Sequence, residues 1–434
     1  MKRKAAVPFI MLASLLDVIG VGLIIPILPL LVGEFTTSRD AQVYWFNALI
    51  ISFGLAQFFC APLLGALSDR YGRRPLLLLG IGGLGVTFAV TALTHSLWLL
   101  VGIRLLGGAL SANFAVAQAY VADITTPEKR TPALGLLGAM FGLGFVLGPV
   151  IGGVLGDIDL RLPLYAAAGL CAVNWLYGLL VLPESLPPDR RTPVAWRRIN
   201  PFSALSGLVR LRGVGPLVFA IAAASLAKLT LQSAWVLYTS FRFQWGPLQN
   251  GMSLFAVGFV AIVVQGGLLK MLLRRFGERR LVAAGLASGA VAYALYGLVP
   301  QGWMLYIVIA ANSLAFAVPT TLQGIVSKAA DPREQGRAMA SLTSLISITG
   351  IAAPLLGGAL LGPVSHLPPD HILVGAPFFA CSALEGFAFL VAVRYFSRHP
   401  ADAAPAPPDN AALGSATPAT IASATRPIAQ SSNR

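Results

Sequence analysis

Four charged residues stand together in one short stretch of this sequence. The segment GALSDRYGRRP, residues 65–75, contains Asp69, Arg70, Arg73 and Arg74, although only 11% of all residues are charged. A carboxylate beside guanidinium groups can form charge-assisted hydrogen bonds and can neutralise a helix terminus. We call such a group of paired charges a charged clasp. A clasp that forms in one conformation of the protein and breaks in another would act as a conformational switch. Membrane topology alone would also explain Arg70 and Arg74, so both interpretations stay open.

Ionisable residues also occur inside long apolar runs. Asp17, Arg104, Lys228 and Glu385 lie in such runs, where a charge is costly unless it is paired, protonated or in contact with water. For Asp17 we expect a proton relay or a substrate contact, with a capping or hydrogen-bonding role as the alternative. Lys228 needs a counter-ion, for which we expect Asp17 ahead of Glu385. Arg104 stands near the start of its run, so its side chain could instead extend to the membrane surface.

The apolar runs indicate the elements that must position these residues. Of the 434 residues, 56% are hydrophobic and the mean hydropathy is +0.76, whereas a soluble domain usually has about 25% charged residues. Because about 20 helical residues cross a bilayer, we expect an all-α integral membrane protein with twelve transmembrane helices. The expected spans are residues 6–31, 43–67, 75–94, 97–121, 132–156, 162–182, 214–238, 248–273, 281–299, 302–326, 338–361 and 374–396.

The positive charge of the chain is distributed unevenly between the turns. The formal net charge is +14, and nearly all Lys and Arg residues fall before the first span, in alternate turns or after the last span. The opposite turns contain only Arg39, Arg161 and Arg242. This asymmetry is the positive-inside rule. We therefore expect both termini in the cytoplasm and no nucleic-acid partner.

The chain divides into two similar halves. RYGRR at 70–74 recurs as RFGER at 275–279, and PVIGG at 149–153 recurs as PLLGG at 354–358, both 205 positions later. Parallel repeats of this kind are typical of transporters whose substrate site lies between the halves. We expect a six-helix half at 1–182, a central cytoplasmic loop at 183–213, a second six-helix half at 214–396 and a disordered cytoplasmic tail at 397–434.

Several segments resemble one family of transporters. GALSDRYGRRP is similar to the loop between the second and third helices of the major facilitator superfamily. DVIGVGLIIPILPLL at 17–31, RLLGGALSANFAVAQAYVADIT at 104–125 and GAMFGLGFVLGPVIGG at 138–153 resemble the tetracycline-resistance type of drug:proton antiporter, in the 12-helix multidrug efflux group. The resemblance runs from the first span to the last. It implies the major facilitator fold and a proton-coupled exporter of a small amphiphilic drug, with a proton-coupled importer of a small metabolite as the alternative.

The resemblance also implies roles for particular residues. Proton coupling would involve Asp17 and Arg104. Gating by the charged clasp would involve Asp69, Arg70, Arg73, Asp123 and Arg130. Close packing of the antiporter helix would involve Gly144, Gly148, Pro149, Gly152 and Gly153, whose small side chains let helices approach.

Polar and aromatic residues at membrane depth outline a mostly apolar cavity with few polar anchors. The candidates are Gln57, Asn113, Phe114, Gln118, Lys228, Trp235, Asn312 and Gln323, and packing between helices is the alternative for each of them. The resembled exporters tend to have a carboxylate in the third and ninth helices, and the best-known ones a histidine in the eighth. The corresponding spans here contain none of these. We therefore expect a cavity that disfavours cationic complexes and accepts neutral or zwitterionic amphiphiles.

Other classes of function fit the sequence less well. No Lys follows a Gly, so the phosphate-binding loop of an ATPase is excluded and a proton gradient is the expected energy source. The histidines and cysteines show no catalytic or metal-ligand spacing, so we expect no enzyme activity, no cofactor and no metal. The expected partners are a small-molecule substrate, protons and lipid. We expect a multi-pass protein of the bacterial inner membrane that acts as a monomer.

Overall fold

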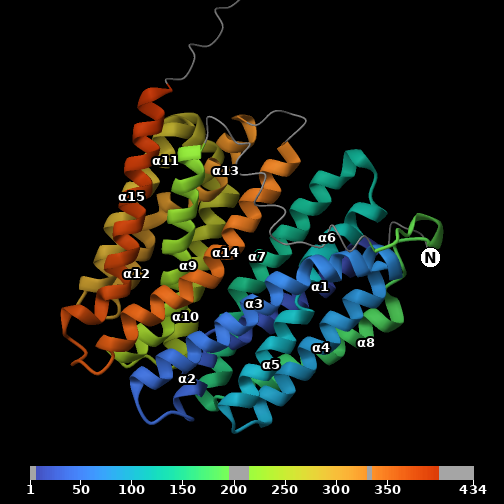
Figure 1. Cartoon of the computed structure of the whole chain (residues 1–434), viewed down its shortest axis with the longest axis horizontal. Coiled ribbons are helices and arrows are strands. Elements are labelled where there is room, and N and C mark those ends of the chain that lie inside the picture. Colours follow the sequence, from blue (N-terminus) through green and yellow to red (C-terminus); the bar gives the residue numbers. More distant parts are fainter. Residues whose placement is uncertain (1–5, 195–214, 330–334, 400–434) are drawn as a thin grey trace, which may run out of the picture.

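The computed structural model describes residues 6–194, 215–329 and 335–399, and the regular structure within them is helical throughout. In Figure 1, helices α1–α8 lie mainly on the right and α9–α15 gather on the left. The first group is α1 (Ala6–Ile24), α2 (Leu28–Gly33), α3 (Arg39–Tyr71), α4 (Arg73–Leu93), α5 (Leu97–Leu110), α6 (Asn113–Ile124), α7 (Pro127–Ile158) and α8 (Leu162–Val181). A single 3₁₀ turn, η2 (Pro188–Arg190), follows.

The second group repeats this arrangement. It contains α9 (Gly215–Phe243), α10 (Pro247–Ile262), the π-helical segment η5 (Val263–Leu268), α11 (Leu269–Leu298), α12 (Met304–Ala311), the 3₁₀ segment η6 (Asn312–Ala317), α13 (Val318–Ala329), α14 (Gln335–Leu361), the short turns η7 (Gly362–Val364) and η8 (Ile372–Gly375), and α15 (Ala376–Arg398). Most of the expected central loop and tail, residues 195–213 and 400–434, lies outside the described residues.

The described helices make twelve crossings of a membrane. Eleven segments are long and apolar enough to span one, and the segment Pro247–Leu298 has 52 residues. At about 1.5 Å per residue, that is more than twice the roughly 30 Å of a bilayer core. Its chain turns at Gly277, where φ is 72° and ψ is 162°. The segment is therefore two spans, which confirms the twelve expected from the apolar runs.

Two glycines mark equivalent turns in the two halves. Among the described residues, only Gly72 and Gly277 are glycines with positive φ, at 107° and 72°, and they are 205 positions apart. This backbone conformation is disfavoured for residues that have a Cβ atom. A Cβ at position 72 would also lie 2.3 Å from the Oε2 atom of Glu184. The sharp return of the chain in both halves therefore depends on glycine.

The fourth span and its counterpart in the second half, the tenth, are both interrupted near the middle. The fourth span breaks between α5 and α6, where Ser111 and Ala112 leave helical geometry. The tenth span contains the 3₁₀ segment η6 between α12 and α13. Just before the break in the fourth span, Gly108 allows α5 to approach α3 so closely that a Cβ there would lie 2.2 Å from the carbonyl oxygen of Phe53.

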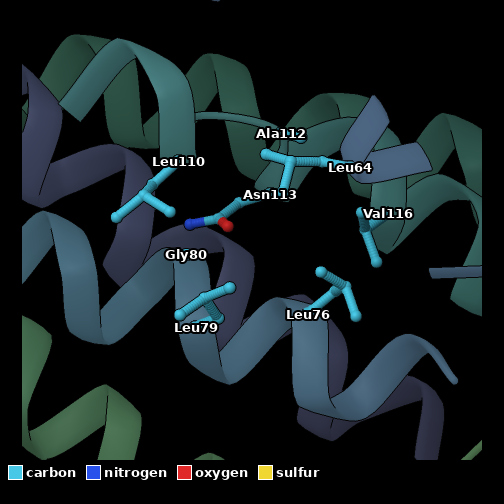
Figure 2. Close-up of a pocket in the computed structure, with 8 residues that line it drawn as sticks. All are labelled: Leu64, Leu76, Leu79, Gly80, Leu110, Ala112, Asn113 and Val116. Atoms are coloured by element: carbon cyan, nitrogen blue, oxygen red, sulfur yellow. The ribbon is translucent and has the colours of Figure 1, made fainter. Parts of the chain in front are cut away.

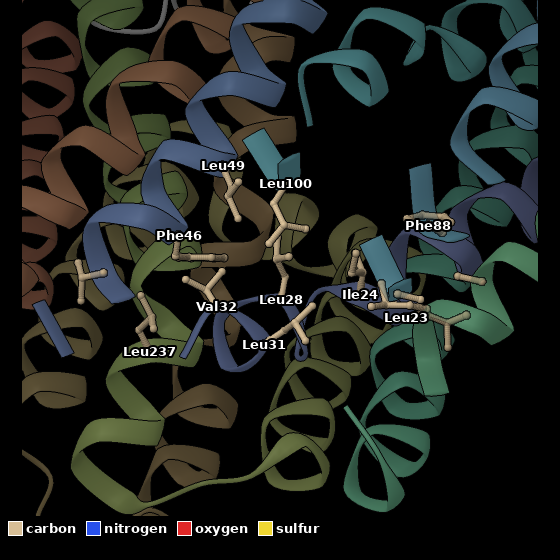
Figure 3. Close-up of a cluster of buried hydrophobic side chains, with 14 of the residues drawn as sticks. Leu23, Ile24, Leu28, Leu31, Val32, Phe46, Leu49, Phe88, Leu100 and Leu237 are labelled. Atoms are coloured by element: carbon tan, nitrogen blue, oxygen red, sulfur yellow. The ribbon is translucent and has the colours of Figure 1, made fainter. Parts of the chain in front are cut away.

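The halves meet mainly along two helix pairs, α7 with α10 and α3 with α14. We call the two ends of the molecule the Gly72 end and the Pro247 end. At the Pro247 end, a buried apolar cluster joins Leu28, Leu31 and Phe46 of the first half to Leu237 of the second (Figure 3). The contact is close enough that a Cβ at Gly358 would lie 2.9 Å from the side chain of Asn47. The structure is therefore closed at the Pro247 end.

Candidate functional site

A cavity of about 1000 Å³ lies between the halves. The first half contributes most of its wall, through α1 and α3 to α8, and α14 supplies most of the opposite side. Side chains from α14 include Thr343, Ser344, Ser347 and Ile351. The wall is mostly apolar, with a few polar groups. This composition suits an amphiphilic small molecule.

Asp17 is the acidic residue in the cavity wall, and it has a defined partner. The side-chain amide of Asn113 donates a hydrogen bond from Nδ2 to Asp17 Oδ1 at 3.0 Å. Asn113 is the first residue of α6, so the break in the fourth span brings this side chain to the first helix. Figure 2 shows the amide directed across Gly80 of α4. A Cβ at Gly80 would lie 1.8 Å from Asn113 Oδ1, so only glycine there leaves room for this bond.

A second polar anchor lies on α3. Gln57 lines the cavity and donates from Nε2 to the carbonyl oxygen of Ser111 at 3.2 Å and to its Oγ at 3.1 Å. These bonds satisfy a carbonyl group that the broken helix leaves free. Gln57 and Asn113 are thus both tied to the interruption of the fourth span, at positions 111 and 113.

Three phenylalanines form an aromatic surface in the cavity. The rings of Phe114 and Phe141 have centroids 4.7 Å apart, and those of Phe141 and Phe145 are stacked at 6.0 Å. All three residues line the cavity. Phe141 and Phe145 were not among the residues expected from the sequence, although their spacing of four in GAMFGLGFVLG places them on one helix face.

The remaining predicted cavity residues do not line this cavity. Trp235 is buried and donates from Nε1 to Ser253 Oγ at 2.9 Å. Asn312 is buried and accepts a hydrogen bond from Ser288 Oγ at 3.1 Å. Gln118 is exposed and Gln323 is half-buried. The helical periodicity that places a residue at membrane depth does not decide which way its helix is rotated.

The two other ionisable residues of the apolar runs have different surroundings from those expected. Arg104 lies 5.9 Å from the ring centroid of Phe53, a cavity residue, and within the described chain it has no ion pair. Lys228 interacts electrostatically with Glu385, and Asp17 is instead bonded to Asn113. The expectation that Asp17 is the first partner of Lys228 is therefore wrong. The packing of α9 against α15 decides the pairing.

The charged turn forms a compact cluster centred on Arg73. Arg73 Nη1 lies 2.6 Å from Asp69 Oδ1, and its Nε lies 3.1 Å from Asp123 Oδ2. Nη1 also donates to Ser68 Oγ at 2.6 Å, and Ser185 Oγ donates to Asp123 at 3.2 Å. The cluster joins α3, α4 and α6 of one half.

Glu184 is a member of this region that the sequence did not reveal. Its carboxylate accepts hydrogen bonds from the backbone N–H groups of Arg73 at 2.8 Å and Arg74 at 3.3 Å. It therefore caps the N-terminus of α4, where a negative charge is stabilising. Glu184 is 112 positions after Gly72, so no local pattern links them.

Two residues expected in the clasp point elsewhere. Arg70 lies over the ring of Tyr71 at 5.2 Å. Arg130 donates from Nη2 to the carbonyl oxygen of Ala122 at 3.1 Å, beside Asp123 but not to its carboxylate. Neither belongs to an ion pair within the described residues.

The second half has an equivalent ion pair with the charges exchanged. Residues 278 and 328 follow 73 and 123 by 205 positions. Glu278 and Lys328 are ion-paired, where the first half pairs Arg73 with Asp123. An ion pair therefore joins the equivalent two helices in each half, but the acidic and the basic residue are exchanged between them.

The small residues of α7 face two different neighbours. Gly144, Gly148 and Gly152 contact α1, and a Cβ at Gly152 would lie 2.2 Å from the carbonyl oxygen of Leu23. Gly153 instead contacts α10 of the other half, where a Cβ would lie 2.7 Å from the carbonyl oxygen of Pro247. The carbonyl group of Pro149 approaches Gly251 of α10 in the same way. One face therefore holds the first half together and the other joins the halves.

Twelve helices in two repeats around a central cavity correspond to a known family. The family model of the Major Facilitator Superfamily matches residues 10–272 and again residues 268–430. The chain belongs to the major facilitator superfamily. It is 37% identical to the class C tetracycline resistance protein of Escherichia coli over 361 residues, which cover 83% of this chain and 90% of that protein. The class D protein of Salmonella ordonez is 33% identical over 357 residues, 82% of this chain and 89% of that protein.

Solved structures of the superfamily have the same architecture. The human organic anion transporter MFSD10 is 26% identical, covers 90% of this chain with 100% of its own and gives a TM-score of 0.63. A bacterial homologue of the human lysosomal transporter Spinster, in an inward-facing and unoccupied conformation, gives a TM-score of 0.68 at 16% identity. This second likeness concerns the fold alone. The chain is thus a multi-pass membrane protein of a transporter superfamily.

Proposed function

We propose that this protein exports a small, planar, amphiphilic antibiotic of the tetracycline type, driven by the inward movement of protons. The observation that carries the proposal is Asp17, a carboxylate in the wall of a cavity that lies between two halves. The relatives are named for tetracycline resistance, which supports the class of substrate. The transporter would act by exposing the cavity to one side of the membrane and then to the other.

The distribution of basic residues supports the direction of the cavity. Lys and Arg concentrate in the turns at the Gly72 end, which the positive-inside rule assigns to the cytoplasm. The contacts between halves close the Pro247 end. The structure would then be the inward-facing state of a protein of the bacterial inner membrane, ready to take substrate from the cytoplasm.

The cavity suits planar and mostly apolar molecules. The surface formed by Phe114, Phe141 and Phe145 offers ring faces, and stacking on aromatic side chains is worth about 0.5–1.5 kcal/mol per pair. Gln57 and Asn113 supply polar groups beside it. Asp17 is the one acidic residue among the described residues that line the cavity. The wall therefore offers little negative charge to a cationic metal complex, which supports uncomplexed tetracycline as the substrate.

Asp17 would couple the proton to the substrate. Its carboxylate accepts a hydrogen bond from Asn113 and faces the cavity, so a proton from solvent can reach it. In the charged form it keeps the bond to Asn113. Protonation removes the charge and weakens that bond, because hydrogen bonds to a charged acceptor are the stronger kind. The proton would thereby alter the link between α1 and α6.

Everted membrane vesicles test this function directly. Vesicles that contain the protein should accumulate tetracycline when respiration acidifies their interior, and a protonophore should abolish the accumulation. The Asp17→Asn variant at equal abundance is the matched control, because it keeps the size and hydrogen bonding of the side chain. Accumulation that survives the protonophore, or transport only in the import direction, would contradict the proposal.

The same vesicles test the form of the substrate. Uptake is measured with tetracycline in the presence of excess Mg²⁺ and in the presence of a chelator. We expect the chelated condition to support transport at least as well. A strict requirement for Mg²⁺ would show that the cationic complex is the substrate.

A further inference from the structure

A buried carboxylate of the second half remains without a role in the mechanism above. Glu385 of α15 is only 4% exposed, and its Oε2 atom is buried without a hydrogen-bond partner. An unsatisfied buried acceptor of this kind is rare in proteins and costly. A carboxyl group at this position is therefore a feature that packing alone would not favour.

The surroundings of Glu385 come from three helices. Lys228 of α9 interacts with it electrostatically. Tyr293 of α11 and Cys381 of its own helix are the other titratable groups that interact with it. Among the described residues, no ion pair within 4.0 Å joins Lys228 to Glu385. The two charges are thus near each other without a direct bond that would fix both of them.

The backbone of α11 leaves space for this carboxylate. A Cβ at Gly289 would lie 2.9 Å from Glu385 Oε1. Any other residue at position 289 would therefore displace the carboxyl group. Glycine here has the same effect as Gly80 beside Asn113 in the first half, where the polar side chain also occupies the space of a missing Cβ.

Lys228 connects Glu385 to the space between the halves. Its side chain is exposed. The next residue, Leu229, lines the central cavity. Water that enters the cavity can therefore approach Lys228, and through it the carboxylate behind.

We propose that Glu385 is a second proton-binding residue of the transport cycle, in the half opposite Asp17, with Lys228 as its counter-charge. In the binding step a hydronium ion in the cavity water gives its proton to the carboxylate, so one O–H bond of the hydronium breaks and a water molecule remains. One O–H bond forms, the charge of Glu385 changes from −1 to zero, and the Lys228 ammonium is left uncompensated. Release of the proton restores the attraction between the two residues. The proposal rests on the proton-driven function above and adds a site to it.

Infrared titration of the purified full-length protein in lipid nanodiscs tests the site without any substrate. Difference spectra between acidic and alkaline buffer report each buried carboxyl group that gains or loses a proton. We expect Glu385→Gln to lose one titrating band and Asp17→Asn to lose another. Glu128→Gln, an exposed glutamate of α7, is the matched control and should keep both. A spectrum of Glu385→Gln with every buried band of the wild type would overturn the proposal.

Two glycine variants keep the test decisive if Glu385→Gln does not fold. Gly289→Ala should shift the Glu385 band, because its Cβ would lie 2.9 Å from the carboxylate. Gly386→Ala should leave the band unchanged, because a Cβ there meets no atom within 4 Å. Lys228→Met should change the titration of the band, because it removes the ammonium group that interacts with the carboxylate. Wild-type spectra in both Gly289→Ala and Lys228→Met would refute the pairing.

Vesicle measurements then separate this proposal from the function on which it rests. In everted vesicles the number of protons released per tetracycline taken up should fall in Glu385→Gln. An unchanged ratio would exclude Glu385 from the cycle. Wild-type protein that shows the infrared band in nanodiscs but no tetracycline-driven proton flux in vesicles would instead contradict the proposed substrate.

Discussion

Gly153, at the contact between the halves, offers a direct test of the equilibrium between the state closed at the Pro247 end and the state open there. Gly153 of α7 faces α10, and a Cβ there would lie 2.7 Å from the carbonyl oxygen of Pro247 and 3.2 Å from the Cα atom of Gly251. Both neighbours are backbone atoms, which cannot move without displacing a helix. We expect Gly153→Ala to separate α7 from α10 at the Pro247 end and so to favour the state that is open there.

The size of the effect follows from the crowding. Overpacking a well-packed contact costs about 1–3 kcal/mol, which corresponds to a change of about 5- to 150-fold in the ratio of the two states. The cost applies only when the Pro247 end is closed, because the helices are apart there in the other state. Gly→Ala also favours a helix by about 1 kcal/mol, but this gain is the same in both states.

Spin labels across the Pro247 end measure the ratio. Labels at the exposed positions Asp159 and Asp370, in a background without native cysteines, should show a new population at longer distance in Gly153→Ala. Gly142→Ala on the same helix is the matched control, because a Cβ there meets no atom within 4 Å. Gly152→Ala crowds α1 within one half and should lower thermal stability instead. An unchanged distance distribution in Gly153→Ala would refute the reasoning.

Three further predictions concern the cavity and the clasp. Asp17→Asn should insert normally but lose proton-driven tetracycline uptake in everted vesicles; uptake that still follows the pH gradient would remove Asp17 from the mechanism. Arg73→Ala should slow transport by about 10- to 150-fold, because it removes charge-assisted bonds worth about 1.5–3 kcal/mol, with little change in tetracycline affinity in detergent. Arg70→Ala is the control and should transport normally. A loss of affinity in Arg73→Ala would make Arg73 a binding residue. Phe141→Ala should raise KM for tetracycline by about 2- to 10-fold, as expected for the loss of an aromatic contact, whereas an unchanged KM would show that the aromatic surface is not the binding site.

Interactions local in the sequence were predictable for this protein. The bilayer requires each span to be an apolar run of sufficient length, so the twelve crossings can be read directly from the chain. The turns at Gly72 and Gly277 follow from a repeated motif, because the same backbone turn needs the same residues in both halves. The ion pair of Asp69 and Arg73 also follows from this motif, because the two residues flank the same tight turn at Gly72.

The tertiary structure alone decided which polar groups meet. Asp17 bonds to Asn113, 96 positions later. The break in the fourth span brings Asn113 to Gly80 of α4, whose missing side chain leaves room for the amide. Glu184, which follows α8, caps the N-terminus of α4. The electrostatic partner of Lys228 is Glu385 rather than Asp17. The rotation of each helix about its axis selects these partners, and that rotation is fixed by packing against neighbouring helices. In a chain where nearly every span is apolar on all sides, hydrophobic periodicity carries little information about it.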